Sequence, residues 1–502
     1  MTVNELPLRF PTDPYCRALS RLMLCVDEES GECFIGVTPD GTQAGRDKLA
    51  RLSPCRGEEI LPYTVAQEGG AIVLSCEDGK ARLAIAKPDR LVVEAEGVSL
   101  LLGKGKSAAV FMGGGNAVDD ALPGALYVNA GVRVRVVARA GSTAVRSSWD
   151  LNALADPDPR VFMHPDANGK LKVEMFASDF DELPADDEAS VDAAVRETLD
   201  EFGRFLDALA APPSDADALR AAYIAWTALQ PPRRLAAPQI TAPVYVSDRR
   251  KLGTAKLSDN VLLAALLADP NEGAERLRAF LALENAEGAV PCEADNRRRL
   301  YESELPLFGV TFLARPDVLD ALTGGDFDAL YRALGWWREF RFCSDRGLFY
   351  YLHRYEPGCG TRAPFSDDPP EFAVELNICM LLWLEAMAKL AGRLGKAEAA
   401  ELGEAAGKLR EALPSLGGRG FDRNGEPLKD DRGGSSFALL LGSGEAPERI
   451  PAAYALPLII AAGNGKELAA KARVRGGKLL TLRRALTLLA ADFAERRGQN
   501  AV

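Results

Sequence analysis

The sequence has only two histidines, His164 and His353, among its 502 residues. Two histidines leave almost no residues from which a histidine metal site or a Ser-His-Asp triad could be built. The nine cysteines form no C-x-x-C pair, and an odd number without that spacing is typical of reduced thiols in the cytosol. We expect no metal, no cofactor and a cytoplasmic location.

Long apolar runs and an excess of positive charge are also missing. The longest apolar run, 450–463, contains Pro451 and Pro457 and is too short to span a bilayer. The first ten residues, MTVNELPLRF, lack the basic and apolar regions of a signal peptide. The net charge of -12 argues against nucleic acid or an anionic membrane as a partner. These features leave the oligomeric state open.

The first third of the chain has the pattern of short strands. Segments rich in Val, Leu and Ala are separated by Gly and Asp-Gly, and the clearest lie at 22–26, 71–75, 81–85 and 132–137. The last of these alternates Val with Arg, as a half-exposed antiparallel strand does. The pattern predicts an N-terminal antiparallel β-sandwich over residues 1–178.

The sequence pattern then changes at two points, near residue 179 and near residue 214. An acidic stretch begins at Asp179, and Ser190 can cap a helix whose apolar stripe runs from Val191 to Leu209, before Pro212 and Pro213 stop it. From 214 the pattern is helix after helix, with no alternation of strand and helix that would indicate a parallel sheet. We therefore predict a linker helix within 179–213 and a helical barrel over 214–502.

The most informative stretch is 326–413. Asp326 is the expected N-cap of a helix that contains Trp337, and Arg346-Gly347 marks a turn before an extended segment that ends near Tyr355. Residues 357–370 are rich in Pro and Gly and predict a loop. A helix with one apolar face follows and ends at Gly395, and a second helix runs to Leu413.

This stretch resembles the (α/α)6-barrel glycoside hydrolases of the group that contains trehalase, processing α-glucosidase and bacterial mannosylglycerate hydrolase. That group has a loop E-S-G-x-D-x-S-P-R-[FW] followed by [VL]-[DE]-L-N, where this chain has EPGCGTRAPF from Glu356 and VELN from Val374. Shorter segments at 222–226, 243–247, 287–291 and 304–309 follow the order of the family. The resemblance covers 222–413 and implies an (α/α)6 toroid of six helical hairpins, with a small saccharide or glycoside as the partner.

The resemblance also implies that the catalytic positions of the family are changed. The family places its acid at the position of Gly360, and the W-x-W-D box reads Lys256-Leu257-Ser258-Asp259. The family has its catalytic base in an aromatic-rich segment like W-E-x-Y-N near the C-terminus, and no segment of this chain past Asp431 resembles it. An inverting hydrolase needs both a proton donor and a base, so we predict very weak or absent hydrolysis of common α-glucosides, trehalose, glucosylglycerate and mannosylglycerate at neutral pH.

Two sets of candidate site residues remain, expected to meet where the loop 355–370 reaches the mouth of the barrel beside Asp259 and Glu293. The candidates for substitute catalytic carboxylates are Glu356, Asp367, Asp368 and Glu375. The candidates for substrate binding are Asp259, Glu293, Trp337, Tyr351, His353, Tyr355 and Arg362.

Each candidate also has an ordinary structural interpretation. Asp367 and Asp368 suit a solvated loop, Glu375 suits the first turn of a helix, and Trp337 suits barrel packing. Three functions therefore stay open: a glycoside hydrolase with relocated catalytic groups, an inactive saccharide-binding or scaffold protein, and an (α/α)6 phosphorylase or lyase. A phosphorylase would need a basic cluster, for which only Arg249-Arg250 and Arg297-Arg298-Arg299 are available.

Overall fold

The structure is a computed structural model. It describes residues 4–9, 11–38, 48–87, 89–106, 110–113, 125–129, 132–146, 148, 150, 157–178, 188–231, 240, 242–248, 253–295, 298–353, 356, 365–428, 434–442, 450, 452–471 and 481–500. The chain divides into two compact units. The first consists of Met1–Asp207, Trp226–Pro231 and Asp248–Gly253, and the second of Ala208–Ala225, Pro232–Ser247 and Thr254–Val502. The boundaries predicted from the sequence, at 178 and 213, stay a prediction.

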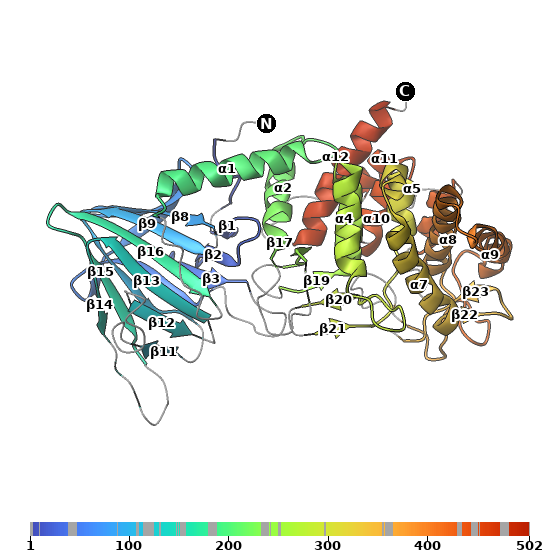
Figure 1. Ribbon diagram of the computed structural model, residues 1–502, viewed down its shortest axis with the longest axis horizontal. Helices are drawn as coiled ribbons and strands as arrows, with labels where there is room; N and C mark the ends of the chain where they lie inside the picture. The colour runs from blue at the N-terminus through green and yellow to red at the C-terminus, as the bar shows by residue number, and fades with distance from the viewer. Residues whose placement is uncertain are drawn as a thin grey trace. The chain divides into compact units, whose positions relative to one another are not determined.

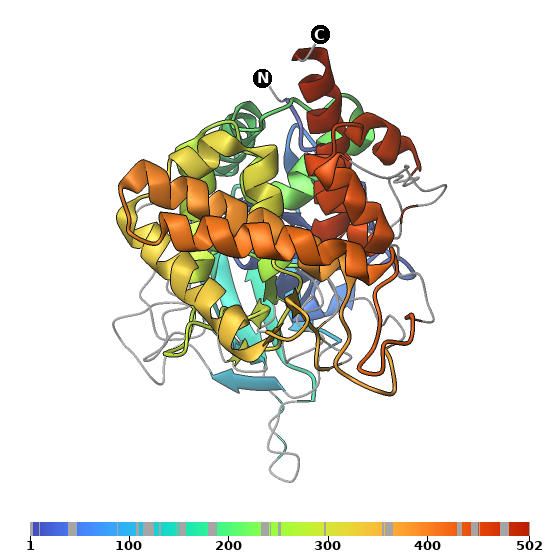
Figure 2. The same ribbon diagram turned by 90° about the vertical axis from the view of Figure 1, so that its right-hand side faces the viewer.

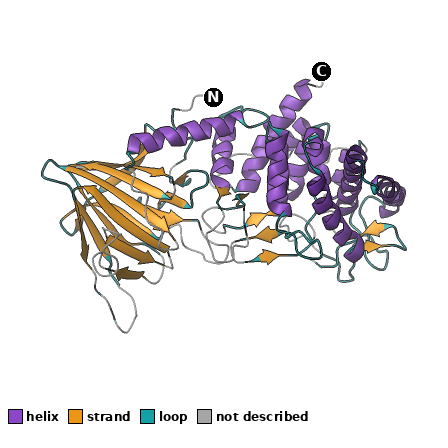
Figure 3. Cartoon of the chain, in the orientation of Figure 1, coloured by secondary structure: helices purple, strands orange, loops and turns teal. Residues whose placement is uncertain are grey.

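The first unit is built on two antiparallel sheets of eight strands each (Figures 1 and 3). One sheet has the order β1 (Tyr15–Cys16), β2 (Leu22–Val26), β3 (Cys33–Val37), β4 (Ala50–Arg56), β10 (Ser99–Lys104), β15 (Arg160–His164) and β14 (Ser142–Arg146), with β5 (Glu59–Ile60) paired to β4. The other has the order β11 (Val110–Gly113), β12 (Ala125–Asn129), β13 (Val132–Ala140), β16 (Lys170–Ser178), β9 (Arg90–Glu96), β8 (Lys80–Ala86), β7 (Ala71–Cys76) and β6 (Tyr63–Glu68). The four strands predicted from the sequence are therefore present.

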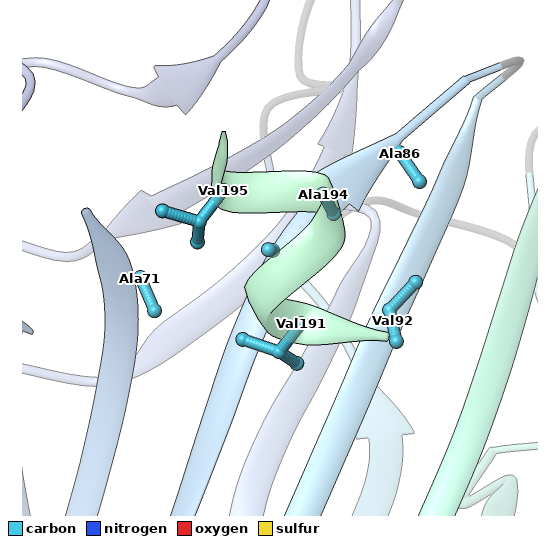
Figure 4. Packing of buried hydrophobic residues seen from close by; sticks show 7 residues of the cluster. Ala71, Ala86, Val92, Val191, Ala194 and Val195 are labelled. Atoms are coloured by element: carbon cyan, nitrogen blue, oxygen red, sulfur yellow. The ribbon is translucent and has the colours of Figure 1, made fainter. Parts of the chain in front are cut away.

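Helix α1 (Val191–Asp207) covers one face of the second sheet. Val191, Ala194 and Val195 are buried against alanines and valines of β7, β8 and β9, as Figure 4 shows. Gly70 has a φ of +84°, and a Cβ there would lie 2.7 Å from the Val195 side chain, so glycine lets the helix approach the sheet. Ser190 caps the helix as predicted, because its Oγ accepts a hydrogen bond from the Ala193 N–H at 3.2 Å.

The helices of the second unit form a ring. Helix α3 packs on α5, α5 on α8, α8 on the short 3-10 helix η4, η4 on α10, α10 on α12, and α12 on α3 again. Further helices lie outside this ring, with α4 on α3, α7 and α9 on α8, and α11 on both α10 and α12. Figure 2 shows α8 and α9 side by side in orange. This is the toroid of helical hairpins expected from the sequence, following antiparallel β-sheets.

The helices after α1 are α2 (Ala216–Ala228), α3 (Leu257–Leu263), η2 (Ala264–Leu266), α4 (Pro270–Leu281), α5 (Phe308–Ala314), α6 (Pro316–Asp320), α7 (Gly324–Phe340), α8 (Val374–Leu394), α9 (Ala399–Ala412), η3 (Leu413–Leu416), η4 (Gly434–Leu441), α10 (Ala452–Ala461), α11 (Gly465–Lys471) and α12 (Leu482–Asn500). The remaining strands are short: β17 (Leu229–Gln230), β18 (Val244–Tyr245), β19 (Ala255–Lys256), β20 (Glu293–Ala294), β21 (Arg299–Leu300), β22 (Phe342–Cys343) and β23 (Leu348–Phe349). None of the described helices is both long and apolar enough to cross a membrane.

Helix α8 has the limits expected from its apolar face, and Gly395 ends it in the left-handed conformation at a φ of 67°. Helix α7 begins earlier than expected. Its N-cap is Thr323, not Asp326, and Asp326 is the third residue of a capping box in which each side chain bonds the backbone N–H of the other. The prediction missed this because Gly324 and Gly325 mask the helical pattern at its start.

Helices α5 and α8 pack closely because of one glycine. A Cβ at Gly309 would lie 2.3 Å from the backbone nitrogen of Trp383, so no larger residue fits there without a shift of the backbone. The indole of Trp383 packs instead on the ring of Phe308, with centroids 5.1 Å apart. This contact sets the position of both helices at the pocket described below.

Candidate functional site

The candidate site begins at the small antiparallel sheet formed by β19, β20 and β21. Lys256 on β19 lies opposite Glu293 on β20, and its Nζ is 3.1 Å from the Glu293 Oε1. Asn260 ties the start of α3 to this sheet, because its side chain donates to the carbonyl of Lys256 at 2.8 Å and bonds both backbone groups of Tyr245. The backbone of Lys256 is therefore held both by its pairing with β20 and by the side chain of Asn260.

A second ion pair joins the first turns of two helices that are far apart in the sequence. Asp259 on α3 is 2% exposed and accepts a hydrogen bond from Nη1 of Arg483 on α12 at 2.9 Å. A buried carboxylate needs such a partner, because its desolvation is otherwise too costly. Lys256 with Glu293 and Asp259 with Arg483 therefore form two ion pairs, each with no net charge. Lys256, Asp259 and Arg483 also interact with Glu304.

Glu304 lies between these pairs, on the irregular segment that connects β21 to α5. Its Oε2 accepts a hydrogen bond from the Ser258 backbone N–H at 3.4 Å. Burial raises the pKa of the Glu304 carboxyl to about 7, and the positive charges of Arg483 and Lys256 only partly oppose this rise. A carboxyl group with such a pKa holds its proton in part of the population at neutral pH and can donate it.

A pocket opens beside Glu304. Its lining combines aromatic rings with carboxylates and consists of Leu257, Ala289, Val290, Tyr301, Glu302, Ser303, Glu304, Pro306, Phe308, Ala333, Trp336, Trp337 and Trp383. The pocket is a small, partly open hollow: the space available to the centres of water-sized spheres is about 20 Å³, and the unfilled space, open solvent included, is about 400 Å³. Apolar walls with a few polar groups are typical of small-molecule sites.

Two buried polar atoms of the lining residues have no hydrogen-bond partner among the described residues. They are Nε1 of Trp383 and Oγ of Ser303. Native proteins rarely leave such groups unsatisfied, so each of these atoms is a place where a buried water can bind. Both atoms are closed off from solvent, so neither is presented to the open pocket.

The catalytic carboxylates predicted from the sequence all lie outside the pocket lining. Glu356 is held by Arg341, with Nη2 2.6 Å from its Oε1, and accepts the backbone N–H groups of Leu352 and His353. These contacts explain its burial as part of the local structure. The catalytic role of Glu356 has no direct test here and stays a prediction.

The other three predicted carboxylates differ in exposure. Asp367 and Asp368 are exposed, as expected for a solvated loop. Glu375 is buried in the first turn of α8 and accepts a hydrogen bond from the Tyr454 hydroxyl at 3.2 Å. The structure therefore places these groups in two different environments, an exposed loop and the buried first turn of α8, and their catalytic roles stay a prediction.

The predicted binding residues are distributed differently. Trp337 lines the pocket, and Asp259 and Glu293 form the two ion pairs beside it. Tyr351 is fully buried and His353 is exposed. Tyr355, Arg362 and the family acid position Gly360 lie outside the described residues, as does most of the loop that contains them.

Several residues of the pocket and of the two ion pairs beside it were not among the site residues predicted from the sequence: Lys256, Tyr301, Glu302, Ser303, Glu304, Trp336, Trp383 and Arg483. Glu304 opens the segment Glu304-Leu-Pro306-Leu-Phe-Gly309, which had been matched to the family only for its order along the chain. That match was the signal that could have directed attention to it.

Comparisons with known proteins identify the fold. No protein-family model matches the chain, and no curated protein matches it in sequence. A family GH92 inverting mannosidase from Bacteroides thetaiotaomicron aligns over 93% of this chain and 70% of its own, with a TM-score of 0.50 and 12% identity. This chain shares the fold of that enzyme, antiparallel β-sheets followed by an (α/α)6 helical domain.

Two other solved structures align less well. The GH63 mannosylglycerate hydrolase from Thermus thermophilus in complex with glucose covers 49% of this chain and 95% of its own, with a TM-score of 0.38 and 14% identity. An α-L-rhamnosidase from Streptomyces avermitilis complexed with L-rhamnose covers 78% of this chain and 35% of its own, with a TM-score of 0.29 and 14% identity.

Proposed function

We propose that this protein binds a small saccharide or glycoside in the pocket beside Glu304 and acts on its glycosidic bond. The observation that supports this most is the composition of the pocket, in which Trp336, Trp337 and Tyr301 surround two carboxyl groups. Aromatic faces provide apolar contact to a sugar ring, and carboxylates accept hydrogen bonds from its hydroxyls.

The same pocket also suits a second candidate, a saccharide-binding protein without hydrolytic activity. This alternative is favoured by Gly360, which replaces the acid of the family that the sequence resembles. A phosphorylase has less support. Arg298 is paired with Asp295 and Arg299 donates to the Leu283 carbonyl, while positions 249, 250 and 297 lie outside the described residues.

The first experiment is a binding titration. Isothermal calorimetry of the full chain with mannose, glucose, L-rhamnose and their methyl glycosides should detect binding of at least one. These sugars are chosen because the solved structures of similar fold act on or bind them. No heat of binding with any of them would contradict the proposed function, whereas binding without turnover would favour the second candidate.

We expect Trp336→Ala to weaken the binding of that saccharide by about tenfold, because an aromatic contact contributes roughly 0.5–1.5 kcal/mol beyond its buried area. Trp336 is suited to this test because it is only partly buried, so its loss disturbs packing less than the loss of Trp337. The measurement is the dissociation constant by calorimetry.

The matched control is Phe342→Ala. Phe342 is 37% exposed, packs on Phe349 and is not part of the pocket lining. Its dissociation constant should stay within about twofold of the original, which is small beside the tenfold expected for an aromatic contact. Equal affinities for the original chain and both variants would show that the sugar binds elsewhere.

A cytosolic location belongs to the same proposal. The eight cysteines among the described residues are all free thiols. Free buried thiols of this number suit a reducing compartment, where disulfides do not form. Fractionation of cells that produce the untagged chain would test this, and recovery with the secreted or periplasmic fraction would contradict it.

A further inference from the structure

Two glutamates on one short segment line the pocket together. Glu302 and Glu304 lie between β21 and α5, separated by a single residue. Because consecutive Cα atoms are about 3.8 Å apart, their Cα atoms lie at most about 7.6 Å from each other. Acid and base carboxyl groups of inverting glycosidases are about 6.5–9.5 Å apart, a spacing that two such long side chains can reach.

The surroundings of the two carboxyl groups differ in the way that an acid–base pair requires. Among the described residues, Glu304 accepts one long hydrogen bond, from the Ser258 N–H. It lies beside Lys256, Asp259 and Arg483, and the ion pairs Lys256–Glu293 and Arg483–Asp259 each have no net charge. Burial raises the pKa of Glu304 to about 7, so this group retains a proton to donate.

Glu302 is partly exposed, and its carboxylate has no hydrogen-bond or ion-pair partner within the part of the chain that the structure describes. A partly solvated carboxylate with free oxygens can accept a proton from a water molecule. No other described acidic residue lines this pocket.

We propose that Glu304 is the general acid and Glu302 the general base of a glycosidic-bond hydrolysis in this pocket. This inference rests on the proposed function, because it names the groups that would act on the saccharide bound there. It assigns the chemistry to the segment before α5 and not to the loop 355–370.

The reaction balances with water as the only co-reactant. The oxygen of a water molecule attacks the anomeric carbon and forms a new C–O bond while the glycosidic C–O bond breaks. The carboxyl proton of Glu304 passes to the departing oxygen, and the carboxylate of Glu302 takes a proton from the attacking water. Proton exchange with solvent then restores both groups, and the sugar is released with inverted anomeric configuration.

The test compares Glu304→Gln and Glu302→Gln with the original chain on two kinds of glycoside of the bound sugar. A methyl glycoside has a poor leaving group and needs protonation, whereas a 2,4-dinitrophenyl glycoside has a good leaving group and does not. Glu304→Gln should lower kcat about 10²–10⁴-fold on the methyl glycoside and less than about tenfold on the dinitrophenyl glycoside. Glu302→Gln should lower kcat about 10²–10⁴-fold on both, because water must be activated in either case.

Two further measurements separate a catalytic role from a structural one. The pH profile of kcat/KM for the methyl glycoside should fall above about pH 7 in the original chain, and this limb should be absent for the dinitrophenyl glycoside. Calorimetry should give both variants dissociation constants within about threefold of the original, because a roughly tenfold change would already require about 1.4 kcal/mol of lost binding.

Glu404→Gln on the outer helix α9 is the control. Glu404 pairs with Lys408 on the helix surface and should leave kcat unchanged on both substrates. Equal kcat losses of Glu304→Gln on both glycosides would overturn its role as the acid. Saccharide binding by the original chain without any turnover would overturn the acid–base assignment while the proposed binding stands, and absence of both would overturn the proposed function itself.

Discussion

Glu174→Ala is expected to lower the free energy of unfolding of the β-sheet unit by about 3–5 kcal/mol, as measured for a broken buried ion pair. Glu174 on β16 is fully buried, and its Oε2 accepts from Arg139 Nε at 3.0 Å. Its Oε1 lies 3.6 Å from Nη1 of Arg90, whose side chain is 1% exposed. Removing the carboxylate takes one opposite charge away from the buried guanidinium of Arg90.

Glu174 also supports the start of α1, because its Oε1 accepts the Ala189 N–H at 2.8 Å. The free energy of unfolding is measured by urea denaturation followed by circular dichroism. Glu58→Ala is the matched control, since Glu58 is paired with Arg146 but its side chain is 65% exposed, and the expected loss is below about 1 kcal/mol. If both variants lose the same free energy of unfolding, solvent reaches Glu174 and its ion pairs stabilise the protein no more than an exposed ion pair does.

Glu304→Gln should stabilise the protein above neutral pH while it removes the proposed acid. The pKa of the Glu304 carboxyl is about 7 in the folded protein and 4.5 in its ordinary state. Between these values the folded state binds more protons than the unfolded state, so the stability of the original chain falls as pH rises. A neutral glutamine has no such loss, and we expect a gain of about 1–3 kcal/mol at pH 8, discounted for partial solvent access.

The measurement is the free energy of unfolding of the original chain and of Glu304→Gln at pH 4.5 and at pH 8. The gain should appear at pH 8 and shrink to about 0.4 kcal/mol near pH 4.5, where the carboxyl is protonated in the folded state and about half protonated in the unfolded state. The pKa of about 7 already includes the effects of Lys256, Asp259 and Arg483, whose charges act on an ionised Glu304 and not on a neutral glutamine. A gain that is equal at both pH values would reflect packing and would contradict the raised pKa.

Local patterns in the sequence were sufficient for most of the fold. The alternation of Val and Arg in 132–137 predicted β13, and the apolar face with Gly395 predicted α8 to within a few residues. Such patterns work because the period of a strand or a helix is set by neighbours within four residues. The start of α7 was misplaced for the same reason, since a capping box that follows two glycines leaves little local periodicity.

The candidate site was less predictable, because its properties come from residues far apart in the chain. Motif matching directed attention to the loop after Tyr351, whereas the pocket with an acid of raised pKa lies at Glu304. Trp337 was named from the sequence and lines that pocket, but Trp383 reaches it only because Gly309 lets α5 and α8 approach.

The sequence by itself determined that this chain has an antiparallel β unit followed by helical hairpins, since both patterns are local. Only the tertiary structure decided which carboxyl group can hold a proton at neutral pH. Glu304 is an ordinary glutamate in the sequence, and its raised pKa depends on burial and on its distance from Lys256 and Arg483. Arg483 lies 224 residues after its partner Asp259, and no local pattern links two positions so far apart.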